Sequence, residues 1–193
     1  MLQAIRAAFA VQTSRLSRTE IFRISTLRRF ARRSEGVAAV EFGMVAAPFL
    51  ALMFAIMETA LVFFASQTLE TAVADSARLI MTGQAQNAAF TQAQFKNAVC
   101  AKLTVMFDCV NGVAIDVQSY TTFSTVDISS PIDASKNFVP PNNYLPGGPT
   151  DIVVVRLFYK WPIFVTGLGF NLANLSGNKR LLTATAAFQN EPY

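Results

Sequence analysis

An almost uncharged run of 29 residues, from Val37 to Ala65, limits what this chain can fold into. Its only charged residues are Glu41 and Glu58, and about 20 apolar residues suffice for a helix to cross the hydrocarbon core of a bilayer. We therefore predict one transmembrane helix, with its membrane span at about 40–65. The run is too long for an ordinary secretory signal and lacks a small-x-small cleavage site at its far end, so we expect the mature protein to keep it.

The charge that precedes this run predicts its orientation. The first 36 residues hold eight arginines against two glutamates, a balance of +6, so that residues 37–193 carry −2. Basic residues next to a membrane helix stay in the cytoplasm, which sends the C-terminal domain to the other side. We expect 1–36 to be a basic cytoplasmic leader, either a flexible tail or an amphipathic helix on an anionic membrane surface. Because the basic charge is confined to the leader, nucleic acid is not an expected partner.

Helical periodicity continues beyond the membrane span. One face of the continuation is marked by Leu69, Val73, Ser76 and Ile80. Gly83 stands where a helix C-cap is expected. The sequence thus predicts a single helix from about Val37 to Thr82, within a transmembrane and stalk region of residues 37–83.

Residues 84–193 are expected to form a small periplasmic domain. A capping box at Thr91-x-x-Gln94 predicts a second helix over about 91–107. Alternation at 113–117 and apolar runs at 152–159 and 181–188 predict strands. The fold class is therefore α+β: a long N-terminal transmembrane and stalk helix, followed by a small domain with a second helix and an antiparallel sheet.

Two stretches of this domain allow more than one interpretation. Residues 121–150 lose periodicity and collect proline and glycine, which favours either a functional surface or a flexible insert. Residues 161–170 are too apolar for a solvated loop. They pack on the core, touch the outer leaflet of the membrane or contact a partner protein.

The two cysteines of the chain, Cys100 and Cys109, lie in the region that would follow the membrane crossing. Outside the cytoplasm they are expected to form a disulfide, and in the cytosol they would be two buried thiols. A closed loop of ten residues would contribute about 2.7 kcal/mol in the chain-entropy account of disulfide stabilisation.

Catalytic chemistry is not expected. The chain has no histidine, which is the commonest general base and metal ligand. Gly167-x-Gly169 lacks the third glycine and the setting of a nucleotide-binding motif. The acidic residues of the domain have no metal-site spacing and are interpreted as solvated surface groups: Asp108, Asp116, Asp127, Asp133 and Asp151. We predict no enzymatic activity, no cofactor and no metal.

Gly36 and Glu41 suggest a specific form of assembly. A carboxylate near the cytoplasmic end of an apolar helix is costly in lipid unless it finds a cation. Cleavage after Gly36 would supply one, the new α-ammonium of Val37. A neighbouring subunit shifted along the axis by about 6 Å, four residues of helix, would bring that ammonium to Glu41. Alternatively, the Glu41 side chain simply reaches the cytoplasmic headgroups.

The basic leader, Gly36, the four following residues, Glu41-Phe42 and the long apolar helix resemble the Tad-type class of type IV prepilins. More specifically, residues 36–86 are similar to the TadE family of minor pilins, or pseudopilins, of the tight adherence (Flp) pilus. The features that carry this resemblance are Ala39-Val40-Glu41-Phe42, Pro48, Glu58, Asp75-x-x-Arg78 and Thr82-Gly83. The cysteines and the closing residues 188–193 also look familial, whereas the leader is longer than a minimal prepilin leader.

The resemblance implies cleavage by a prepilin peptidase between Gly36 and Val37, and assembly roles for Glu41, Phe42 and Glu58. It implies a single-pass protein of the bacterial inner membrane that helps to build an extracellular pilus for adhesion and biofilm formation. The implied partners are the peptidase, other Tad pilins and minor pilins, the inner-membrane assembly platform and membrane lipid. Two alternatives are an uncleaved, membrane-anchored binding or envelope-scaffold protein that works through residues 121–150, and a pseudopilin of a secretion system.

Overall fold

The computed structural model describes residues 34–103, 105–166 and 171–193. The predicted leader therefore lies outside the described residues, apart from its last positions. The chain divides into two units, one up to Leu52 and one from Met53 to Tyr193. A single helix, α3 (Ser34–Met81), is 48 residues long and is helical throughout, Pro48 included. The prediction of one long N-terminal helix is confirmed.

The sheet of the second unit has three antiparallel strands in the order β1-β2-β3. These are β1 (Val113–Tyr120), β2 (Ile152–Pro162) and β3 (Lys179–Gln189). All three lie where alternation or apolar runs predicted strands, and each is longer than its sequence pattern indicated. β2 is the central strand and is buried from Ile152 to Phe158, because both of its faces are covered.

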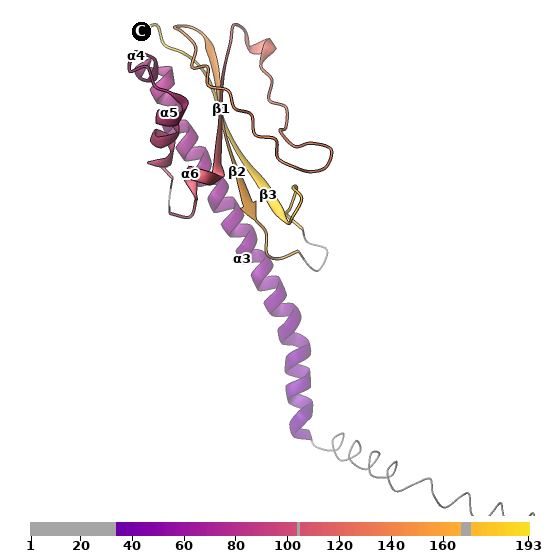
Figure 1. The fold of residues 1–193 in the computed structure, drawn as a ribbon. Coiled ribbons are helices and arrows are strands. Elements are labelled where there is room, and N and C mark those ends of the chain that lie inside the picture. The colour runs from indigo at the N-terminus through magenta and orange to yellow at the C-terminus, as the bar shows by residue number, and fades with distance from the viewer. Residues whose placement is uncertain (1–33, 104, 167–170) are drawn as a thin grey trace, which may run out of the picture. The chain divides into compact units, whose positions relative to one another are not determined.

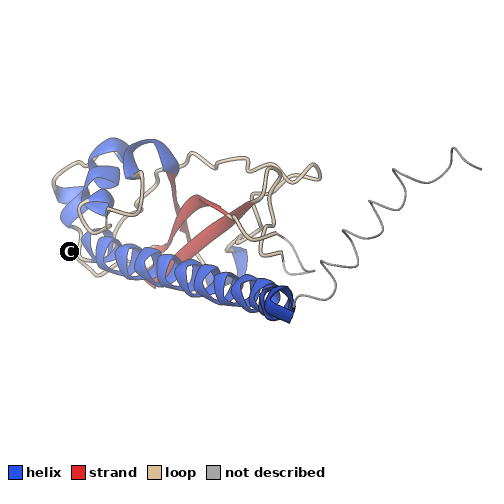
Figure 2. Ribbon diagram, turned by 90° about the horizontal axis from the view of Figure 1, so that it is seen from below, coloured by secondary structure: helices blue, strands red, loops and turns tan. Residues whose placement is uncertain are grey.

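One face of the sheet packs against the C-terminal part of α3. The buried positions of the helix recur every three or four residues, as expected for a helix with one face on a core. They are Val62, Ala65, Leu69, Val73, Ala77 and Ile80. From the sheet, alternate residues such as Val153, Val155 and Leu157 join the same cluster. Figures 1 and 2 both show this part of α3 lying beside the strands.

Three short helices follow α3: α4 (Gln84–Asn87), α5 (Gln92–Cys100) and α6 (Cys109–Gly112). The capping box predicted at Thr91 is present, since its hydroxyl accepts from Gln94 N–H and the Gln94 side chain accepts from Thr91 N–H. The prediction of a helix as far as 107 is wrong, because α5 ends at Cys100. The chain has to turn back there for Cys109 to reach Cys100.

The proline-rich stretch 121–150 covers the second face of the sheet. It contains a short helix, η1 (Phe123–Thr125), and residues that pack on the sheet, among them Ile132 and Phe138 against Phe158. Val117 N–H donates to Asn143 O, and Leu145 N–H donates to Val117 O, both at 2.9 Å. This stretch is thus part of the folded unit, a role that neither sequence interpretation described.

The C-terminus of the chain closes over the end of α3. Gly83 has φ of 74°, a left-handed conformation that glycine adopts without strain. A Cβ atom there would lie 2.3 Å from Cγ of Tyr193. Glu191 N–H also donates to Met81 O at 2.9 Å. Gly83 therefore ends the helix as predicted, and its missing side chain leaves room for the last residue.

Candidate functional site

The predicted cleavage and assembly residues lie at the beginning of α3, in the first unit. Gly36, Val37, Glu41 and Phe42 are all exposed there, with Phe42 75% accessible. A Cβ atom built on Gly36 meets no other atom within 4 Å. The residues are therefore presented on the helix surface, and their roles in processing and register stay predictions.

The part of α3 that follows is apolar on all sides. Between Glu41 and Glu58 there is no charged residue, and most of the large side chains are exposed. These are Phe42, Met44, Val45, Phe49, Leu50, Leu52, Met53, Phe54, Ile56 and Met57. Among the described residues, α3 is the one helix long and apolar enough to cross a membrane. An exposed surface of this kind needs lipid or other apolar helices around it.

Glu58 marks the point where α3 begins to be buried by its own domain. Its side chain is only 7% accessible, and its carboxylate accepts two backbone hydrogen bonds. Phe164 N–H donates to Oε1 at 2.5 Å, and Val165 N–H donates to Oε2 at 3.0 Å. Hydrogen bonds to a carboxylate are among the stronger ones in proteins. Glu58 thus holds the segment after β2 against the helix, and its predicted role in assembly stays a prediction.

The segment 161–170 is divided between core and surface. Trp161 packs against the core cluster, and Ile163 is buried within it. Phe164 is 83% accessible, the highest value among the described phenylalanines. Residues 167–170 lie outside the described part. The core-packing interpretation therefore holds for Ile163, while Phe164 presents its ring to the surroundings.

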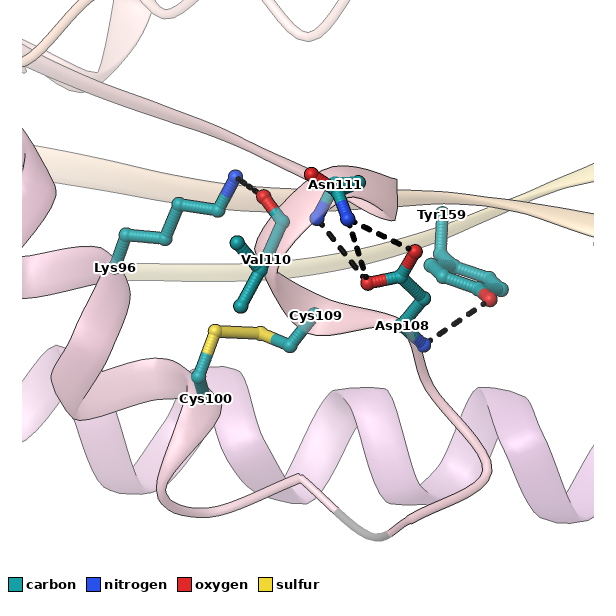
Figure 3. The surroundings of a disulfide bond; sticks show 7 residues. All are labelled: Lys96, Cys100, Asp108, Cys109, Val110, Asn111 and Tyr159. Carbon is teal, nitrogen blue, oxygen red and sulfur yellow. Dashed lines mark hydrogen bonds between the residues drawn. A yellow bond between two sulfur atoms is a disulfide. The ribbon is translucent and has the colours of Figure 1, made fainter.

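A disulfide bond joins Cys100 at the end of α5 to Cys109 at the start of α6, as predicted, with Cα atoms 5.6 Å apart (Figure 3). Around it, Asp108 caps α6 by accepting from Asn111 N–H, and Lys96 Nζ donates to Val110 O at 2.9 Å. The disulfide closes the loop between the two helices and ties α5 to the beginning of β1.

Reducing this disulfide is expected to destabilise the second unit. Cys100→Ser should lower its free energy of unfolding by about 2–3 kcal/mol, since the open loop gains entropy in the unfolded state. Denaturant unfolding of the full chain in detergent, followed through the single tryptophan, measures the loss. Dithiothreitol should produce the same loss in the unmodified chain and none in the variant. Equal stability of the reduced and oxidised chains would contradict this expectation.

A buried ion pair lies on the opposite face of the sheet. Arg156 of β2 donates from Nη2 and Nε to Oδ2 of Asp116 on β1, at 2.7 and 3.0 Å. Asp116 also accepts from Gln118 and Asn143, and Arg156 Nη1 donates to Ser129 O. The interpretation of Asp116 as a solvated group is wrong: its side chain is 1% accessible, because residues 121–150 cover this face. The sequence signal for it was an arginine inside an otherwise apolar strand.

Two groups of the stretch 121–150 have shifted pKa values. The pKa of Asp127 is lowered, first by the hydrogen bond from Ser129 N–H and then by that from the Ser129 hydroxyl. Burial raises the pKa of Tyr144, whose ring packs against Phe95. The pKa shift of Asp127 thus has a local cause in the turn at 127–129, and that of Tyr144 comes from its packing in the folded unit.

Cavities of the second unit offer little that suggests catalysis. A hollow of about 530 Å³ lies between α5, β1 and residues 140–142, and its charged lining residue is Lys96, which is hydrogen-bonded to Val110 O. Within the described ranges, no cluster of three or more His, Cys, Asp or Glu residues is arranged to hold a metal ion. The candidate functional features of this chain are therefore those of α3.

Comparison with known proteins gives a match within the same part of the chain, helix α3. The family model described as TadE-like protein matches residues 36–78. Searches of curated proteins and of solved structures gave no match. The matched part is 43 of the 193 residues and lies entirely within α3, so the likeness concerns this helix. Over residues 36–78, the part of α3 that carries Glu41 and Glu58 is thus similar to the TadE-like family, the family that its motif predicts.

Proposed function

We propose that this protein is a minor pilin, or pseudopilin, that takes part in assembling a Tad (Flp) type IV pilus for surface adhesion and biofilm formation. The observation that carries the proposal is the two-part character of α3. Its first part is apolar and exposed on all sides, whereas from Glu58 onward one face is buried under the sheet. Outside the membrane, the exposed apolar part of α3 would be stable only if similar helices packed around it in a bundle.

Maturation would convert this membrane protein into an assembly unit. A prepilin peptidase would cut between Gly36 and Val37 and remove the basic leader. The new α-ammonium of Val37 and the carboxylate of Glu41 then carry opposite charges near one end of the helix. Pairing of the ammonium of one subunit with Glu41 of the next would fix the axial register between helices that otherwise pack through apolar side chains alone.

The partners in this scheme are the peptidase, other Tad pilins and minor pilins, the inner-membrane assembly platform and membrane lipid. The chain would cross the inner membrane once, with the N-terminus in the cytoplasm and residues 84–193 in the periplasm before assembly. The disulfide between Cys100 and Cys109 supports this location for the domain, since disulfides persist in oxidising compartments.

Substitution of Gly36 by leucine tests the processing step. We expect the variant to accumulate as a precursor that retains the leader, with mature protein reduced at least about tenfold, as for a site that admits only a small residue. Open space around Gly36 means that the helix itself should tolerate the side chain. Gly43→Leu, at another glycine of α3 with no atom near its Cβ position, is the matched control and should be processed normally.

Immunoblots of membranes from cells that also express the peptidase distinguish precursor from mature chain by the mass of the leader. Normal processing of Gly36→Leu would place the cut elsewhere. An absence of processing in the unmodified chain would favour the uncleaved, membrane-anchored protein.

A further inference from the structure

We propose that one end of the second unit rests on the membrane surface, with the ring of Phe164 in the interface and basic side chains on the phosphates of anionic lipids. This surface, called the basic end below, consists of residues 160–166 and 179–180. The proposal depends on the membrane span that the proposed function assumes, and it adds a contact between lipid and the outer domain.

The position of the basic end relative to α3 follows from hydrogen bonds. Glu58 accepts from the backbone N–H groups of Phe164 and Val165, so both residues lie at the level of Glu58 on the helix. Ile163 anchors the same segment from the inside, since its side chain is buried and its N–H donates to Asn178 O at 2.9 Å. The segment is therefore held firmly while the Phe164 ring points away from the core.

The length of the uncharged part of α3 places this level at the edge of the bilayer. Sixteen residues, 42–57, separate Glu41 from Glu58. At about 1.5 Å per residue, the 17 steps from Glu41 to Glu58 along an ideal helix rise about 26 Å, close to the hydrocarbon thickness of about 27–30 Å. With Glu41 at the cytoplasmic boundary, Glu58 and the Phe164 segment would lie at the outer one. There the carboxylate has its own backbone donors and needs no lipid partner.

The side chains at this level have the character of an interfacial belt. Three residues of α3 just beyond Glu58 are large, apolar and exposed: Leu61, Phe63 and Phe64. The next charged residue of the helix is Glu70. Phe63 and Phe64 lie about 8–9 Å farther along the helix than Glu58, so they and Phe164 place exposed aromatic rings within the depth of a headgroup region, where such rings are common in membrane proteins.

The charges of the basic end complement an anionic lipid surface. The connection from Tyr159 to Leu181 contains Lys160, Lys179 and Arg180 and no acidic residue. These residues meet at one end of the sheet, because Pro162 pairs with Lys179 and Trp161 with Arg180. At the opposite end of the same two strands stand Asp151 and Glu191. The two ends of the sheet thus carry opposite charges, and Phe164 lies at the positively charged end.

Depth-dependent quenching of a fluorescent label tests the contact. The full chain carrying Phe164→Cys is labelled with an NBD maleimide and reconstituted into vesicles of phosphatidylcholine with about 30% phosphatidylglycerol. The native cysteines are bonded to each other and do not react. Phe54→Cys, in the exposed apolar part of α3, reports on the span. Phe123→Cys, an exposed phenylalanine of η1 at the other end of the sheet (Figure 1), reports on the solvated domain.

We expect the label at 164 to be quenched by lipid carrying a nitroxide near the headgroup, the label at 54, about 6 Å of helix below Glu58, by one on the upper part of the acyl chain, and the label at 123 by neither. Replacing Lys160 and Lys179 by glutamine, or omitting phosphatidylglycerol, should reduce quenching at 164 roughly twofold, since each basic residue adds to lipid attraction.

Quenching at 54 without quenching at 164 would overturn this proposal and leave the proposed function standing. No quenching at either position would overturn the membrane span, and with it both proposals. Efficient disulfide formation between two copies of unlabelled Phe164→Cys, with protection from nitroxide lipid, would overturn it in favour of a contact between copies of this chain.

Discussion

Replacing Asp116 by alanine is expected to lower the free energy of unfolding of the second unit by about 3–5 kcal/mol, the range for breaking a buried ion pair. The substitution leaves the guanidinium of Arg156, 8% accessible, without its counter-charge. It also removes the acceptor of the side-chain amides of Gln118 and Asn143. Because Asn143 belongs to the stretch that covers the sheet, the packing of residues 121–150 should loosen as well.

Denaturant unfolding of the full chain in detergent measures this loss, with Trp161 as the single tryptophan reporter. Asp127→Ala is the matched control, since Asp127 is an exposed carboxylate of the same stretch and its loss should leave the unfolding midpoint nearly unchanged. Combining Asp116→Ala with Arg156→Leu should recover part of the stability, because no unpaired charge is then buried. A loss below about 1 kcal/mol for Asp116→Ala would show that the pair is solvated.

Replacing Glu41 by alanine is expected to leave processing largely intact and to reduce surface pili at least about tenfold. Without the carboxylate, the ammonium of Val37 in the next subunit would enter an apolar helix bundle without a partner. Leaving one charge of a buried pair alone costs about 3–5 kcal/mol, and about 1.4 kcal/mol already changes an equilibrium tenfold. The defect should therefore appear after cleavage, as mature protein that stays in the membrane.

Sheared pili and membrane fractions, blotted in parallel, separate this defect from a failure of processing. Glu70→Ala is the matched control, because Glu70 is exposed on the same helix and lies outside the apolar part. It should leave both fractions unchanged. Normal piliation by Glu41→Ala would contradict the pairing with Val37 and favour a Glu41 side chain that only reaches the headgroups.

The long helix and the strands could be predicted because their patterns are local. Leu69, Val73 and Ile80 recur at helical spacing, and the structure buries all three against the sheet. The limits of the second helix could not be predicted in the same way. Apolar residues continue at helical spacing after Cys100, and the constraint that ends the helix is a bond to Cys109.

The two buried carboxylates depended on contacts between distant parts of the chain. The alternation along β1 places Asp116 on the polar face of the strand, which suggests contact with solvent. Residues 121–150 cover this face, but they have no periodicity from which their packing on the sheet could be predicted. Glu58 was recognised as a charge in an apolar run, but its donors are backbone groups more than 100 residues away in the sequence. Neither partner could be inferred from the residues next to the carboxylate.

The measurement that tests the central claim most directly is N-terminal sequencing of the protein isolated from cells that make the pilus. A pilin matured after Gly36 begins at Val37, with the α-ammonium that the assembly scheme requires. Sequencing both the membrane fraction and the sheared pili should give this N-terminus in the two pools. A chain that begins at Met1 in the membrane and is missing from pili would contradict the account, and would identify the protein as an uncleaved, membrane-anchored one.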